Sequence, residues 1–160
     1  MDKKRINITE SQLRNMITNS IKQNIIMEEE EMDTEDNSFK GKATKFLGWL
    51  EGCHQALKVM HWTADTNHKH TLTDDIDKAV LRFEDKVAEV VMGITGERIT
   101  SLSSDKPSDS GLEEFLSDLE KNVLDFLDEF EGKREYRGLV NVCDDFLSDI
   151  ETFKYLSELK

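Results

Sequence analysis

The chain is poor in residues that break helices or cross-link a fold. Its 160 residues include one proline, eight glycines and two cysteines. Because proline and glycine interrupt helices, we expect long helices and an all-α fold class. The two cysteines, Cys53 and Cys143, have no second cysteine at metal-ligand spacing, which excludes a disulfide framework and a zinc knuckle. We expect both to be buried free thiols.

Long apolar runs and positive charge are also scarce. No stretch approaches the roughly 18 apolar residues that span a bilayer, and the N-terminus lacks the apolar block of a secretion signal. Lysine and arginine number 21 against 34 aspartates and glutamates. Nucleic acid requires clustered basic residues, so DNA binding is not expected, whereas an acidic surface attracts cations. The sequence therefore predicts a cytoplasmic protein without membrane contact.

Histidine is scarce too, but it is concentrated in one place. Three of the four histidines lie in HWTADTNHKHTLTDD, residues 61–75, which ends in Asp74 and Asp75. Imidazole and carboxylate together suit iron, manganese or zinc. A metal site near this stretch is therefore the first functional hypothesis.

The first 36 residues differ from the rest of the chain. Thr9 and Gln12 have capping-box spacing and precede an amphipathic helical stripe, formed by Leu13, Met16, Ile17, Ile21 and Ile25. The acidic stretch MEEEEMDTEDNS that follows is typical of a solvated linker. We predict a domain boundary near residue 37. The N-terminal helix either packs on its own protein or a neighbouring subunit, or serves as a docking tag.

Four apolar stripes at helical spacing follow from residue 38 onward. They are Phe39, Ala43, Phe46, Leu50, Cys53, Leu57 and Met60; then Ile76, Val80, Phe83, Val87 and Val90; then Leu112, Phe115, Leu116, Leu119, Val123, Phe126, Leu127 and Phe130; then Leu139, Val140, Cys143, Phe146, Leu147, Ile150, Phe153 and Leu156. A long connection, GITGERITSLSSDKPSDSG, separates the second stripe from the third. Two hairpins joined by a crossover predict a ferritin-like four-helix bundle over residues 37–160.

Potential metal ligands lie on the outward side of the second predicted helix. At about 100° per residue, four of them face away from the core stripe: His70, Asp74, Asp85 and Glu89. A solvated polar face would explain them. However, Leu81, Ala88 and Met92 share this face, and apolar residues there indicate contact with another subunit.

The spacing of these ligands requires that second subunit. Asp74 and Asp85 lie roughly 16 Å apart along a helix, so one ion cannot touch both within one chain. An antiparallel two-fold partner that crosses near Leu81 would bring Asp85 and Glu89 of one copy opposite His70 and Asp74 of the other. His61, at the end of the first predicted helix, could join them.

These residues carry a resemblance to a known family. LKVMHW, then His70 with Asp74 four residues later, then DKVAEV with Asp85 and Glu89, resemble the ferroxidase motif of Dps-type miniferritins. The resemblance implies metal-binding, catalytic residues from two subunits: His61, His70 and Asp74 from one, Asp85 and Glu89 from its two-fold neighbour. It also implies Fe²⁺ oxidation by peroxide or oxygen, iron storage and a dodecameric shell of two-fold dimers. One departure is a shorter loop before His70, and His68 is an alternative to His61.

A rival iron site and a rival function remain open. Glu51 and His54 have the Glu-x-x-His spacing of di-iron sites inside ferritin bundles, but no histidine after His70 supplies the second copy, so we interpret them as a chance pair. Trp49 and Trp62 are expected to be packing residues. The alternative function is a non-catalytic ferritin-like structural or packaged protein of phage origin, located in the virion, with the N-terminal helix as its docking tag.

Overall fold

The computed structural model describes residues 10, 17–19, 38–103, 107 and 111–159. The chain divides into two compact units, Met1–Gly41 and Lys42–Lys160. Most of the predicted N-terminal helix and the acidic linker lie outside the described residues. Glu10 and residues 17–19 are helical.

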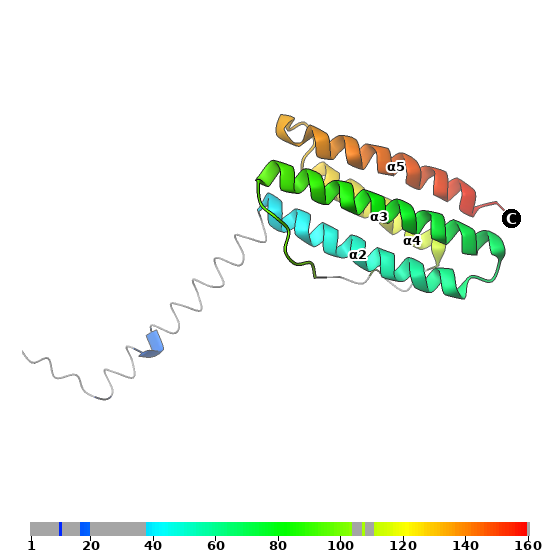
Figure 1. Ribbon diagram of the computed structural model, residues 1–160, viewed down its shortest axis with the longest axis horizontal. Coiled ribbons are helices and arrows are strands. Elements are labelled where there is room, and N and C mark those ends of the chain that lie inside the picture. The colour runs from blue at the N-terminus through cyan, green and yellow to red at the C-terminus, as the bar shows by residue number, and fades with distance from the viewer. Residues whose placement is uncertain (1–9, 11–16, 20–37, 104–106, 108–110, 160) are drawn as a thin grey trace, which may run out of the picture. The chain divides into compact units, whose positions relative to one another are not determined.

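The described part of the chain is helical and contains no strand. Four long helices are α2 (Phe39–Thr63), α3 (Asn67–Thr95), α4 (Leu112–Asp128) and α5 (Arg137–Ser157), with the short 3₁₀ helix η1 (Arg134–Tyr136) before α5 (Figure 1). This confirms the prediction of an all-α helical bundle. Within the described residues, no helix is long and apolar enough to cross a membrane.

The helix boundaries follow from local chemistry at the ends of α3. Thr66 has extended backbone angles, and its side-chain oxygen accepts a hydrogen bond from the Lys69 backbone amide at 3.2 Å. This is the usual N-cap arrangement, and it starts α3 after a turn of only residues 64–66. At the other end, Gly96 adopts φ of 70° and donates its amide to the Met92 carbonyl. A left-handed glycine at this position ends a helix without steric cost.

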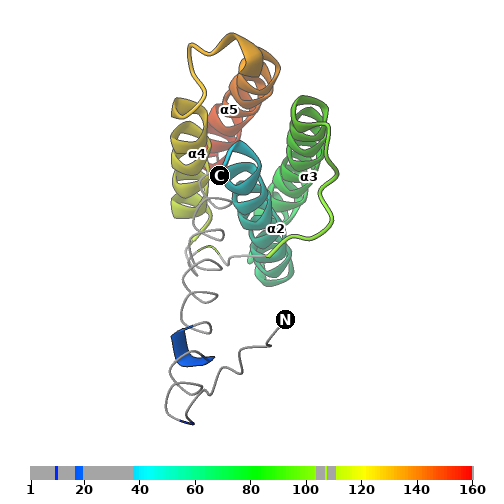
Figure 2. The ribbon, with the colours of Figure 1, turned by 90° about the vertical axis from the view of Figure 1, so that its left-hand side faces the viewer.

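The four helices form two antiparallel hairpins. α2 and α3 make the first, and α4 and α5 make the second (Figure 1). α3 and α4 run in the same direction, so α4 begins at the end of the bundle opposite to the end where α3 stops. Seen from its end in Figure 2, the bundle has α2 beside both α3 and α4.

A layer of phenylalanines sets the register of the bundle, with one ring from each long helix. Phe46 stacks on Phe126 and Phe83 stacks on Phe146, each with ring centroids 4.0 Å apart. Phe46 also meets Phe83 edge to face at 6.1 Å. Aromatic pairs in these geometries contribute about 0.5–1.5 kcal/mol beyond their buried area. This layer therefore joins all four helices at one level.

The predicted apolar stripes supply most of the core. Of the second stripe, Val90 is only half-buried, and Val91 beside it is buried instead. Both cysteines are buried free thiols, as predicted. Burial raises the pKa of Cys53 above its usual range and that of Cys143 to about 12, which keeps both thiols protonated and unreactive.

The connection after α3 passes closely over α2. The Ser103 carbonyl oxygen lies 2.0 Å from the position that a Cβ atom at residue 48 would take. Gly48 is buried in the middle of α2. Only glycine leaves room for this backbone contact, so Gly48 determines where the connection crosses the helix.

Candidate metal centre

His61 and His70 lie face to face at the turn between α2 and α3. His61 is in the last turn of α2, and His70 is in the first turn and a half of α3. Their ring centroids are 3.8 Å apart with an interplanar angle of 28°. The short turn 64–66 thus brings together two histidines that the sequence predicts as ligands.

Each imidazole is held by the backbone of the other helix. The Nδ1 atom of His61 lies 3.0 Å from the His70 carbonyl oxygen, and the Nδ1 atom of His70 lies 3.1 Å from the His61 carbonyl oxygen. A carbonyl oxygen only accepts, so both Nδ1 atoms carry the proton and donate it. The lone pair of a neutral ring is then on Nε2. Both histidines therefore have a fixed tautomer with a nitrogen suited to bind a metal ion.

This arrangement also gives a backbone carbonyl at the end of α2 a hydrogen-bond partner. The His61 carbonyl belongs to the last turn of α2, where carbonyls have no partner within the helix. The His70 ring supplies a donor to it. The same hydrogen bonds therefore close the α2/α3 hairpin and orient the two rings.

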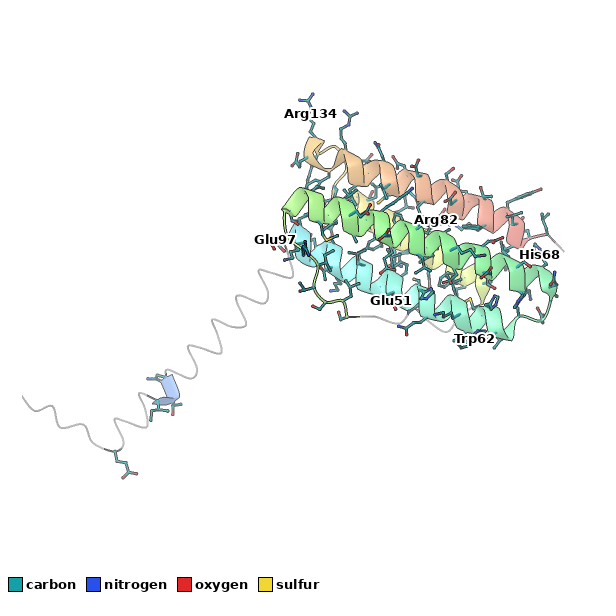
Figure 3. The ribbon with its side chains drawn as sticks, in the orientation of Figure 1. Glu51, Trp62, His68, Arg82, Glu97 and Arg134 are labelled. Atoms are coloured by element: carbon teal, nitrogen blue, oxygen red, sulfur yellow. The ribbon has the colours of Figure 1, made fainter. Side chains whose placement is uncertain are left out.

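His68 has a different partner. Its Nε2 atom lies 2.9 Å from the Leu156 carbonyl oxygen in the last turn of α5, so the ring donates to a carbonyl at that helix end. Figure 3 shows His68 at the end of the bundle near α5. The geometry pairs His61, and not His68, with His70.

Asp74 follows His70 by one helical turn and lies in the field of both imidazoles. Lys78 donates to its Oδ2 atom at 2.5 Å. This hydrogen bond is the main cause of a pKa at Asp74 below the usual range, and the charges of Lys78, His61 and His70 add to it. Asp74 is therefore ionised at neutral pH and available as a negatively charged ligand.

Asp85 and Glu89 are exposed on the same helix, far from the histidine pair. α3 is one continuous helix, so Asp85 lies about 16 Å along its axis from Asp74. Among the residues that the structure describes, no three His, Cys, Asp or Glu side chains are grouped to hold a metal ion. One chain thus offers two imidazoles with a nearby carboxylate at one end of α3, and two further carboxylates elsewhere.

Large apolar side chains are exposed on both helices of the hairpin. Trp62 is 74% exposed, Val59 52% and Leu81 40%. Trp62 projects from the C-terminal end of α2 (Figure 3). Its predicted role as a packing residue is therefore wrong within one chain, because the helix ends beside it and nothing covers its ring in the described part of the structure. Trp49 does pack, stacking on Phe46 at 6.0 Å.

The rival pair, Glu51 and His54, is arranged differently from a di-iron motif. The His54 Nδ1 atom lies 2.5 Å from Oδ1 of Asp77 on α3, and both side chains are largely buried. Burial, followed by the charge of Glu51, raises the pKa of Glu84 nearby. The sequence prediction missed Asp77 as the partner of His54. The hairpin register could have revealed this partner, because an antiparallel pairing that sets residue 61 opposite residue 70 also sets residue 54 opposite residue 77.

Comparisons of this chain with protein-family models, with curated proteins and with solved structures found no match.

Proposed function

We propose that this chain is a subunit of a Dps-like protein that binds and oxidises iron, with a metal site shared between two-fold related subunits. The observation that carries the proposal is the His61 and His70 pair. Both rings are fixed by Nδ1 donation to backbone carbonyls, and both keep Nε2 for a metal. Hydrogen bonding of the second ring nitrogen to a carbonyl or carboxylate is the rule for histidines that bind metals in proteins.

The helix order supports the same family. Two hairpins with α3 and α4 parallel need a connection that returns along the bundle, as in ferritin-like proteins with one long crossover. The resemblance of residues 57–89 to the Dps motif places the same histidines at this point. We therefore infer a ferritin-like bundle.

A second copy of the chain completes the site. The hairpin exposes large apolar residues, Val59 and Trp62 on α2 and Leu81 on α3, which suit burial against another subunit. An antiparallel copy crossing near Leu81 brings its Asp85 and Glu89 toward the His70 and Asp74 end of the first chain. Symmetry then gives two equivalent sites per dimer, and further assembly into a shell follows the family resemblance.

Fe²⁺ is the substrate of this site, and the protein residues bind and orient it. His61 and His70 supply neutral nitrogen ligands, while Asp74 and the second copy's Asp85 and Glu89 supply negative charge that favours Fe³⁺ over Fe²⁺. With hydrogen peroxide, two Fe²⁺ ions each lose one electron, and the peroxide takes two electrons and two protons to give two water molecules. Manganese and zinc fit the same ligands, but zinc undergoes no redox change.

The decisive experiment compares two histidine variants of the metal-stripped protein. His70→Ala should abolish rapid Fe²⁺ oxidation and weaken Zn²⁺ binding at least tenfold, because it removes one ligand and the donor that fixes the α2 terminus. The matched control is His54→Ala, which removes a histidine paired with Asp77 and should retain most of the oxidation rate. A folded but inactive His54→Ala protein would support the rival site.

The same measurements distinguish iron oxidation from the alternative function, a non-catalytic structural protein. Tight Zn²⁺ binding without Fe²⁺ oxidation would indicate a structural bundle whose metal stabilises the dimer, since binding free energy at an interface becomes assembly free energy. A wild-type protein that binds no divalent metal would overturn the proposal. The docking role of the N-terminal helix stays a prediction, because most of that helix lies outside the described residues.

A further inference from the structure

Lys78 forms an ion pair with Asp74, whose carboxylate the proposed site requires as a ligand. Its Nζ atom lies 2.5 Å from Oδ2 of Asp74 and 3.8 Å from Oδ1 of Asp75. Lys78 follows Asp74 by one turn of α3, so the ion pair forms along the helix surface within one chain. Both side chains are about half exposed, at 55% for Lys78 and 46% for Asp74. The ammonium can therefore leave without disturbing the core.

The two-fold arrangement places Lys78 among further carboxylates. Residues 74 and 89 are symmetric about the midpoint between residues 81 and 82, and so are residues 78 and 85. An antiparallel pairing that sets Asp74 opposite Glu89 of the second copy thus also sets Lys78 opposite Asp85 of that copy. Without a cation, the three carboxylates of such a site would repel one another. This register therefore sets Lys78 beside Asp85 of the second copy as well as beside its own Asp74 and Asp75.

We propose that Lys78 is the counter-ion of the metal-free site, bound to Asp74 until Fe²⁺ displaces it. This inference rests on the proposed function. A lysine suits the role because its charge is on a long flexible stem that can withdraw, whereas a divalent ion binds the carboxylate directly and carries twice the charge. Iron binding is then a competition with Lys78, which lowers the iron affinity and offsets part of the negative charge of the metal-free site.

The ion pair is tested first without any metal. Lysine amines of the intact protein are acetylated under limiting conditions, and the rate at each lysine is read by mass spectrometry. Lys78 should react at least twofold faster in Asp74→Asn than in the wild type, because its amine is released. Lys69 pairs with Asp65 in the same i,i+4 geometry, so its rate should not change. Equal Lys78 rates in the two proteins would refute the ion pair, whatever the protein does with iron.

The competition is tested with Zn²⁺, which fits the same ligands and is not oxidised. Saturating Zn²⁺ should raise the Lys78 acetylation rate in the wild type and leave the Lys69 rate unchanged. Lys78→Met should tighten Zn²⁺ binding about twofold to fivefold, the range expected for release of an exposed ion pair. Lys69→Met, which removes the same charge from the neighbouring pair, is the control and should bind Zn²⁺ as the wild type does.

The results distinguish the two proposals. If the wild type binds Zn²⁺ but Lys78→Met binds it no more tightly than Lys69→Met, the counter-ion role is wrong and the proposed function stands. If neither the wild type nor Lys78→Met binds Zn²⁺, the proposed function fails, and the counter-ion role fails with it.

Discussion

The proposed sharing of the metal site by two subunits can be tested by mixing two inactive variants. Because α3 runs unbroken from Asn67 to Thr95, Asp74 and Asp85 are held about 16 Å apart along one helix. Metal–ligand bonds are close to 2 Å long, so no ion reaches both in one chain. Asp74→Ala, and the double variant Asp85→Ala with Glu89→Ala, should each abolish rapid Fe²⁺ oxidation as pure assemblies.

Mixing the two variants under subunit exchange should restore a defined share of activity. In a mixed dimer, one of the two sites loses all three carboxylates. The other takes Asp74 from the doubly substituted chain, and Asp85 with Glu89 from the chain substituted at residue 74, so it is intact. Random pairing at equal concentration makes about half of the dimers mixed, with one working site of two, so about a quarter of the wild-type rate should return.

The assay follows Fe³⁺ formation by absorbance after exchange, and native mass spectrometry confirms that mixed dimers have formed. Each variant exchanged against itself is the control. Demonstrated exchange with no recovered activity would refute the shared site. Full activity of either variant alone would also refute it, since one chain would then suffice.

Three further predictions concern the proposed interface, the contact between Ser103 and α2, and a partly buried carboxylate. Leu81→Glu should place like charges at the two-fold axis and convert the assembly to monomers, and a wild type that sediments as a monomer at micromolar concentration would contradict this. Gly48→Ala should lower the free energy of unfolding by about 1–3 kcal/mol in chemical denaturation, because its Cβ would clash with the Ser103 carbonyl. The control Gly93→Ala has open space around it and should raise the free energy of unfolding by about 0.5–1 kcal/mol. Equal effects of the two substitutions would exclude the contact. Burial raises the pKa of Glu84, so its ionisation costs stability above its usual pKa of 4.5. Glu84→Gln should therefore raise the melting temperature at pH 7 but not at pH 4, and no difference at pH 7 would count against this.

The helices were predictable because their apolar residues repeat over many turns. The stripes containing Phe46, Phe83, Phe126 and Phe146 each fit one helix face, and all four of these rings are buried. Single positions at the edge of a stripe were less certain. Val90 and Val91 differ by only about 100° around α3, so a small rotation of the helix decides which of the two is fully buried.

The contacts across the α2/α3 hairpin depended on register, which periodicity does not give. Spacing alone brought His61 and His70 to the same end of the bundle, but their reciprocal hydrogen bonds require a turn of only residues 64–66. The same register joins His54 to Asp77, and the sequence prediction did not extend it that far. The exposure of Trp62 could not be predicted from the sequence pattern either, because it depends on where α2 ends.

The reciprocal hydrogen bonds of His61 and His70 would lower the entropy cost of binding a metal ion at the proposed site. Both rings lose their rotational freedom when α2 and α3 fold together, before any ion arrives. Binding then orders few additional side-chain torsions, which is the advantage of a preorganised ligand pair. Conversely, fraying of the last turn of α2 would break both hydrogen bonds and free both imidazole rings to rotate. An ion held by the pair should therefore slow hydrogen exchange at this hairpin end more than in the rest of the bundle.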